Sequence, residues 1–285
     1  MRLLVFGETG QVARELIRRA PSDVQITALS RDRADLLDPA ACAAVVRESD
    51  VDVIINAAAW TAVDLAETEE AAATVVNGDT PTAMAGAAAE RGLPFLHIST
   101  DYVFDGAGNT PFAPDHTADP IGAYGRSKLK GEEGIRSFGG AHLILRTSWV
   151  FSAHGSNFVK TMLRLGAERD SLTVVADQIG GPTPAAAIAD ALIIAARAMV
   201  NGALGGTHHF AGAPDSNWAD FARAIFKETG LSCCVNNVSS SDYPSPVRRP
   251  LNSRLDCSSF SEAFSIKRPD WRAGISDIFK ELSIS

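Results

Sequence analysis

RLLVFGETGQVARELIRRA, residues 2–20, decides the expected fold, because it reads as an apolar strand, a glycine turn and a helix. Gly7 permits a tight turn, and Gly10 lets a diphosphate approach the backbone. Amides at the helix start, near Gln11 and Val12, favour a bound phosphate. A plain strand-to-helix turn would also explain the glycines, but their place at the first such junction favours a dinucleotide site.

Short β-like runs alternate with alanine-rich helical runs over the first 150 residues. The expected strands are Arg2–Phe6, Gln25–Leu29, Val53–Asn56, Phe95–Ser99 and Leu143–Thr147. The expected helices are Gln11–Ala20, Pro39–Ser49, Ala66–Asn77 and Pro81–Arg91. This order predicts an α/β fold with a Rossmann-type, doubly wound parallel sheet covered on both faces.

The character of the chain changes after Val150. Helical runs over Asn157–Arg169, Ala185–Met199 and Trp218–Thr229 alternate with loops rich in glycine, proline and serine. We expect an NAD(P)-binding domain over residues 1–150, which later segments rejoin. Residues 151–285 should form mainly a smaller, partly interleaved α/β substrate-binding domain.

Charge and hydropathy exclude several classes of protein. The 285 residues carry a formal net charge of −8, which argues against a duplex-DNA binder. No apolar run approaches the ~18 residues of a membrane span, and the N-terminus lacks a secretory signal. The four cysteines show no CxxC or metal-ligand spacing. We therefore expect a cytoplasmic protein that binds neither nucleic acid nor membrane.

The end of the second expected strand bears on cofactor choice. Ser30 and Arg31 follow it, and an arginine there suits the 2′-phosphate of NADP. Asp32 and Arg33 come next, so NADPH is favoured modestly and NADH stays possible. The full set of expected cofactor-binding residues is Gly7, Gly10, Gln11, Val12, Ser30, Arg31, Asp35, Leu36, Ala57, Ala58, Ala59, Thr61, Tyr124 and Lys128.

Tyr124 and Lys128 are candidates for acid–base chemistry. They are four residues apart in YGRSKLKGE, so on a helix they share a face. A nearby cation stabilises phenolate and makes tyrosine a usable proton donor near neutral pH. Thr100 ends an apolar run, where a parallel strand would point it into the ligand crevice. Together they suit reduction of a ketone, with Thr100 polarising the carbonyl.

With these residues assembled, the chain resembles the extended short-chain dehydrogenases/reductases, and within them the dTDP-4-dehydrorhamnose reductase family. The segments that carry the resemblance span nearly the whole chain. They are GETGQVA (7–13), NAAAWTAVDLAE (56–67), STDYVFDG (99–106), YGRSKLKGE (124–132), LRTSWVF (145–151), NFVKTMLRL (157–165), DQIGGPT (177–183) and RRPLNSRLD (248–256).

The resemblance implies a reaction in dTDP-rhamnose biosynthesis, reduction of the C4 ketone of dTDP-4-dehydro-β-L-rhamnose with NAD(P)H. It makes Tyr124 the proton donor. It implies that Lys128 holds the nicotinamide ribose and that Thr100 bonds the C4 oxygen. Asp101 and Trp149 align with positions at the sugar. The remaining expected substrate-binding residues, near the nucleotide diphosphate, are Asn157, Gln178 and Arg249, with loop capping equally open for Asn157 and Gln178.

Two departures from the family's pattern matter. Trp60 stands where tyrosine or histidine is more usual. Some members dimerise around a divalent metal held by a glutamate on the first helix, which Glu15 matches, and another soon after the proline–threonine pair. Here PAAAIAD follows Thr183 without a glutamate. We therefore expect no specific metal site, and either a monomer or a homodimer.

Two other functions remain open. A nucleotide-sugar epimerase or dehydratase would retain NAD⁺, but dehydratases of this superfamily usually carry an acidic pair directly after the strand-end threonine. Here Asp101 and Tyr102 follow Thr100. A non-catalytic regulatory subunit could keep the fold and the cofactor site. The intact Tyr124 and Lys128 weigh against that role.

Overall fold

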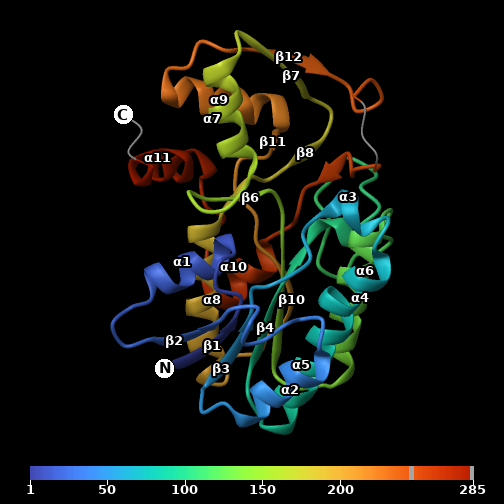
Figure 1. Cartoon of the computed structure of the whole chain (residues 1–285), viewed down its shortest axis with the longest axis vertical. Helices are drawn as coiled ribbons and strands as arrows, with labels where there is room; N and C mark the ends of the chain where they lie inside the picture. The colour runs from blue at the N-terminus through green and yellow to red at the C-terminus, as the bar shows by residue number, and fades with distance from the viewer. Residues whose placement is uncertain (244–246, 283–285) are drawn as a thin grey trace.

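A six-stranded parallel sheet occupies the lower part of the molecule in Figure 1, in a computed structural model that describes residues 1–243 and 247–282. Its strand order is β10-β5-β4-β3-β1-β2. The strands are β1 (Arg2–Phe6), β2 (Gln25–Leu29), β3 (Val53–Asn56), β4 (Phe95–Thr100), β5 (His142–Thr147) and β10 (Gly206–His209). The five predicted strands are confirmed to within one residue. The sixth, β10, comes from the second half of the chain.

The strand order reverses at β1. Val5 pairs with Ala28 of β2 on one side and with Ile55 of β3 on the other. In open parallel sheets the ligand crevice lies beyond the carboxyl ends of the strands at such a reversal. Gly7, after β1, and Ala57, after β3, therefore stand at the mouth of the expected crevice.

Helices cover both faces of the sheet, which confirms the doubly wound arrangement (Figure 1). Alternate residues of β1 face opposite sides: Leu3 and Val5 belong to one apolar core, and Leu4 and Phe6 to the other. The first core is closed by α1 (Gln11–Arg19), α8 (Ala185–Val200) and α10 (Ser258–Phe264). The second is closed by α2 (Pro39–Glu48), α5 (Thr80–Glu90) and α6 (Ala123–Ser137).

A separate apolar core fills the upper part of the molecule. It contains Phe221 and Trp271, whose rings meet edge to face at 5.2 Å. Its elements are α7 (Phe158–Glu168), α9 (Trp218–Thr229), α11 (Trp271–Glu281) and the parallel pair β7 (Ser171–Val175) and β12 (Cys234–Val238). Short strands lie between the two parts: β6 (Val150–Phe151), β8 (Ile179–Gly180), β9 (Thr183–Pro184), β11 (Ser216–Asn217) and β13 (Asn252–Ser253).

The single helix predicted over Ala66–Asn77 is wrong. The chain forms α3 (Val63–Ala66), breaks, and resumes as α4 (Glu70–Thr74), the π turn η1 (Val75–Asp79) and α5. In the π turn, Asn77 points inward: its Oδ1 accepts from the Trp60 N–H (2.8 Å), and its Nδ2 donates to Ser127 Oγ (3.0 Å). These tertiary hydrogen bonds shape the helix, and local helix propensity does not encode them.

No helix in the described part of the chain has the length and apolar character that a membrane crossing requires.

Candidate active site

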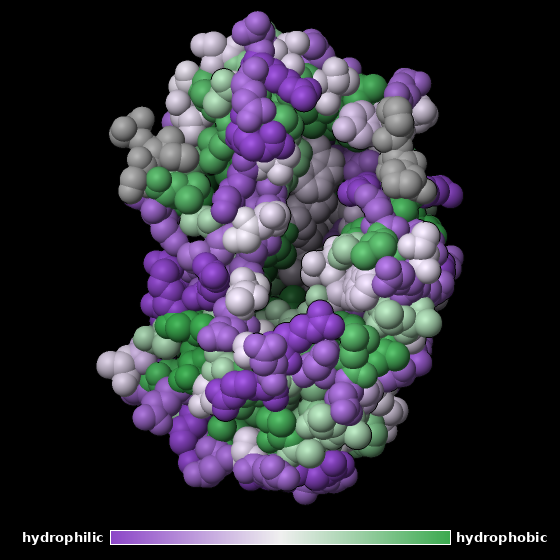
Figure 2. Space-filling model, viewed as in Figure 1, coloured by the Kyte–Doolittle hydropathy of each residue, from purple (hydrophilic) through white to green (hydrophobic). Residues whose placement is uncertain are grey.

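A cleft of about 1050 Å³ opens between the carboxyl edge of the large sheet and the upper part of the molecule. Figure 2 shows it as a hollow between the two parts. This volume is at the upper end of the range for small-molecule sites, so it can hold a dinucleotide and a second ligand. Every expected cofactor-binding residue lines the cleft: Gly7, Gly10, Gln11, Val12, Ser30, Arg31, Asp35, Leu36, Ala57, Ala58, Ala59, Thr61, Tyr124 and Lys128.

The glycine turn forms one end of this cleft from backbone alone. Gly7 has a φ of 106°, which side chains rarely adopt, and a Cβ there would lie 3.4 Å from Ala57 O and Ala58 Cβ. Gly10 caps α1, and within residues 1–243 and 247–282 no side-chain hydrogen bond caps this helix start. These amides are therefore free to bind a phosphate, and they fit the diphosphate of a dinucleotide.

Beyond β2, a charged loop forms the rim of the cleft. The Arg31 side chain is 75% exposed, and its Nε lies 3.3 Å from Asp35 Oδ2. A hydrogen bond from the Leu37 N–H, with help from Arg31, holds the pKa of Asp35 below its usual value. Arg31 is thus anchored loosely, in a position open to an anionic group.

The expected catalytic trio meets in the middle of the cleft. Thr100 ends β4, and Tyr124 lies in the first turn of α6. A Cβ on Gly125 would collide with the Tyr102 carbonyl oxygen, so a glycine there lets α6 pack closely against the segment after β4. Burial raises the pKa of the Tyr124 phenol well above its usual value, and the Thr100 side chain, hydrogen-bonded to it, partly opposes this. The phenol therefore holds its proton at neutral pH.

Lys128 lies one helical turn further along α6 and is almost fully buried. Its Nζ lies 2.8 Å from the Ile98 carbonyl oxygen, to which it donates, and 3.0 Å from His97 Nε2. Burial lowers the pKa of Lys128 to about 8, while the Glu132 carboxylate acts in the opposite direction.

Asp101 is a buried carboxyl group beside Thr100. Its Oδ1 lies 3.2 Å from Thr100 Oγ1, whereas Oδ2 has no hydrogen-bond partner among the described residues. Burial raises the pKa of Asp101 to about 6, although hydrogen bonds from Ser253 and Thr100 act to lower it. A buried polar atom without a partner is unfavourable, and it fits a site completed by a ligand's hydroxyl group.

Aromatic side chains form another part of the cleft's wall. Trp149 has a left-handed backbone (φ 49°), rare for a residue with a side chain, and its ring stacks on Trp218 at 3.6 Å. Arg249 also lines the cleft, with Nη2 3.0 Å from Asp64 Oδ1. Trp218 and Tyr102 line the cleft but were not predicted as site residues. STDYVFDG contained the signal for Tyr102, whereas only tertiary structure brings Trp218 to Trp149.

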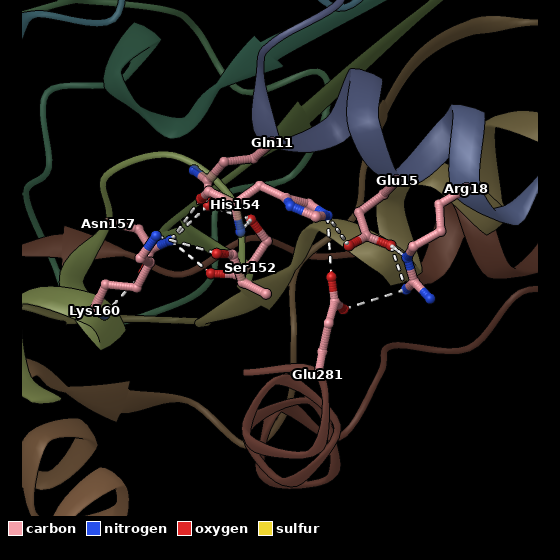
Figure 3. A network of polar contacts seen from close by, with 9 residues as sticks. Gln11, Glu15, Arg18, Ser152, His154, Asn157, Lys160 and Glu281 are labelled. Atoms are coloured by element: carbon pink, nitrogen blue, oxygen red, sulfur yellow. Dashed lines mark hydrogen bonds and ion pairs between the residues drawn. The ribbon is translucent and has the colours of Figure 1, made fainter. Parts of the chain in front are cut away.

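Asn157 and Gln178 lie outside the lining of the cleft, behind residues that form it. Asn157 caps α7, and its Nδ2 donates to Gln11 Oε1 (2.9 Å), as Figure 3 shows. Gln178 Oε1 accepts from Trp218 Nε1 at 3.1 Å. Both side chains therefore hold lining residues in place.

The loop before α7 also joins a charged cluster next to α1 (Figure 3). His154 Nε2 lies 3.3 Å from Glu15 Oε1 and 3.2 Å from Glu281 Oε1. Arg18 pairs with both carboxylates, at 2.6 Å and 3.7 Å. The sequence had singled out Glu15 alone. The cluster ties α1, the loop and α11 together behind the cleft.

Known proteins share the sequence pattern and the fold of this chain over almost its whole length. The family model described as the RmlD substrate binding domain matches residues 1–284. A dTDP-4-dehydrorhamnose reductase of Sinorhizobium fredii is 45% identical over 95% of this chain and 94% of its own length. The crystal structure of a dTDP-4-dehydrorhamnose reductase from Clostridium acetobutylicum is 32% identical, with a TM-score of 0.92 over 99% of this chain and all of that one. The Bacillus anthracis enzyme, in complex with NADP, is also 32% identical, with a TM-score of 0.90 over 98% of this chain and 99% of that one. This chain belongs to the RmlD substrate-binding-domain family, whose relatives named here are dTDP-4-dehydrorhamnose reductases.

Proposed function

We propose that this protein reduces the C4 ketone of dTDP-4-dehydro-β-L-rhamnose to the alcohol, giving dTDP-β-L-rhamnose. The observation that carries the proposal is the meeting of Thr100, Tyr124 and Lys128 in one cleft, between uncapped helix amides and an aromatic wall. NADPH, when bound along the glycine turn, supplies the hydride. Residues 1–150 hold the cofactor, and residues 151–285 mainly hold the nucleotide sugar.

The chain's own groups provide the proton and the orientation. With substrate bound, Thr100 Oγ1 turns its single proton from Asp101 Oδ1 to the C4 oxygen and donates a hydrogen bond there. Tyr124, which burial keeps protonated, gives its phenol proton to the same oxygen as negative charge develops there. Lys128 holds the nicotinamide ribose and stabilises the phenolate left behind. Asp101 Oδ2 accepts a hydrogen bond from a sugar hydroxyl.

Different residues bind the cofactor's 2′-phosphate and the sugar nucleotide. Arg31 favours NADPH through the 2′-phosphate, with NADH as a weaker cofactor. Trp149 covers the apolar face of the deoxysugar, and Arg249 binds its diphosphate. Asn157 and Gln178 position Gln11 and Trp218 for these contacts. The enzyme works in the cytoplasm as a monomer or homodimer.

A spectrophotometric assay tests this function. Purified protein should oxidise NADPH, followed at 340 nm, when dTDP-4-dehydro-β-L-rhamnose is added, and should oxidise NADH more slowly in a parallel cuvette. dTDP-glucose is the control, because it has the nucleotide and a hexose but no ketone. An unchanged absorbance with the keto sugar would contradict the proposal.

A further inference from the structure

A row of three buried polar side chains runs from β3 to the catalytic lysine. Asn56 on β3, His97 on β4 and Lys128 on α6 are each at most 1% exposed. Asn56 Nδ2 lies 3.2 Å from His97 Nδ1, and His97 Nε2 lies 3.0 Å from Lys128 Nζ. The proposed mechanism uses the lysine but leaves the other two residues unexplained.

The backbone fixes the orientation of the Asn56 amide. The Ala58 N–H donates to Asn56 Oδ1 at 3.1 Å. A backbone N–H can only donate, so the atom facing it must be the amide oxygen. The amide nitrogen therefore faces His97, and it donates to Nδ1 because an amide NH₂ group has no lone pair to offer.

The position of the histidine proton follows from this orientation. With Nδ1 accepting, a neutral His97 carries its proton on Nε2, where it points at Lys128 Nζ. An uncharged amine can accept that hydrogen bond while donating one of its own N–H groups to the Ile98 carbonyl oxygen. An ammonium group has no lone pair, so it would face the Nε2–H with a second donor.

We propose that Asn56 and His97 are positioning residues that hold a donor against Lys128 and thereby favour its uncharged amine. They set the pH at which the cation beside Tyr124 is lost. The inference rests on the proposed function only in this last step, since the hydrogen-bond pattern is independent of the reaction.

The charges around Lys128 are consistent with this role. Burial lowers the pKa of Lys128 to about 8. Burial, together with the charge of Lys128, holds the pKa of His97 well below its usual value. Glu132 favours the ammonium. Its carboxylate, however, is already bound to Arg146 at 2.6 Å and to Arg136 at 3.1 Å. Among the described residues, the other titratable groups at this point of the cleft are Tyr124 and Tyr102, which burial keeps protonated, and Asp101.

The tautomer of His97 can be measured directly by ¹⁵N NMR of the histidine-labelled full chain at pH 9, without substrate or cofactor. We expect His97 to carry its proton on Nε2. His209 provides an internal reference, because Arg146 donates to its Nε2 (3.3 Å) and so requires the proton on Nδ1. A His97 protonated on Nδ1, or on both nitrogens, would overturn the proposal.

Asn56→Asp tests the consequence for Lys128. A carboxylate accepts from both the Ala58 N–H and His97 Nδ1–H, so His97 Nε2 becomes an acceptor that suits an ammonium. We expect the His97 proton to move to Nδ1 and the pKa of Lys128, followed by lysine ¹⁵Nζ NMR, to rise by about one unit. The loss of kcat/KM at high pH should move up equally. The Lys128→Met variant assigns the lysine signal.

Asn77→Asp is the matched control, because it introduces the same carboxylate at another buried asparagine, one hydrogen bond from Ser127 on α6. His97 should keep its proton on Nε2 there. A Lys128 pKa in Asn56→Asp no higher than in the unchanged protein would contradict the proposal. An error in the proposed reaction would leave both NMR results unchanged, because neither depends on turnover.

Discussion

The proposed cofactor half of the cleft is made largely of backbone, whereas the proposed sugar half is made of side chains. In the first, Gly7 and Gly10 open the turn, and α1 begins at the cleft without a side-chain cap. In the second, Trp149 stacks on Trp218, and Asp101 keeps an oxygen without a partner among the described residues. Backbone recognises a diphosphate common to many ligands, whereas side chains distinguish one sugar from another.

The two halves meet at Tyr124, so its loss should have the largest effect. Tyr124→Phe removes the proton donor and keeps the ring, and kcat should fall about 10²–10⁴-fold. NADPH affinity, measured by fluorescence titration, should stay within about twofold. Tyr243→Phe, at a half-exposed tyrosine, is the control and should keep full turnover. Equal losses of turnover and NADPH affinity in Tyr124→Phe would show that the phenol serves binding.

Asp101 tests the cost of a buried carboxyl group in the sugar half. Its pKa of about 6 lies above that of an unfolded aspartate, so the folded protein binds the extra proton and loses stability as pH rises from about 4 to 6. Relative to Asp101→Asn, the free energy of unfolding should fall by about 2 kcal/mol between pH 4 and pH 7.

Chemical denaturation of both proteins across this pH range measures the difference, with exposed Asp115→Asn as the control. If the free energies of unfolding of the unchanged protein and of Asp101→Asn differed by the same amount at every pH, the Asp101 carboxyl group would not be desolvated.

Trp218→Ala should weaken binding of the sugar nucleotide without weakening binding of NADPH. Loss of the ring stacked on Trp149 should raise the KM for the sugar nucleotide about tenfold, the usual worth of one aromatic stacking contact. The Kd for NADPH should not change, because the glycine turn does not depend on this wall. Trp218→Phe should recover part of the loss. A weakened NADPH affinity would contradict the division of the cleft into two halves.

Arg31 should have the smallest effect, since its side chain is largely exposed. Arg31→Ala should weaken NADPH binding about fivefold, near 1 kcal/mol, and leave NADH binding unchanged. Arg33→Ala, at an exposed neighbour that does not line the cleft, should leave both affinities unchanged. If NADPH and NADH affinities fell together in Arg31→Ala, the arginine would not read the 2′-phosphate.

The sequence predicts residues that lie close together in the chain better than residues that only the fold brings together. Gly7 and Gly10, and Tyr124 with Lys128, lie close together in the chain, so their spacing alone pointed to the site. Trp218 joins Trp149 from about seventy residues away, and no local pattern marks that contact. The same holds for β10 and for the π turn around Asn77, which tertiary hydrogen bonds shape. Asn157 and Gln178 sit in recognisable motifs, yet the structure places both behind the lining.

Isotope transfer tests most directly whether the two halves meet over the C4 ketone. The protein is incubated with dTDP-4-dehydro-β-L-rhamnose and NADPH deuterated on both C4 positions of the nicotinamide, and the product is analysed by NMR. We predict one deuterium at C4 of the sugar for each NADPH oxidised, with none at the other carbons. NADPH oxidation without deuterium at C4, or deuterium at a different carbon, would contradict the account.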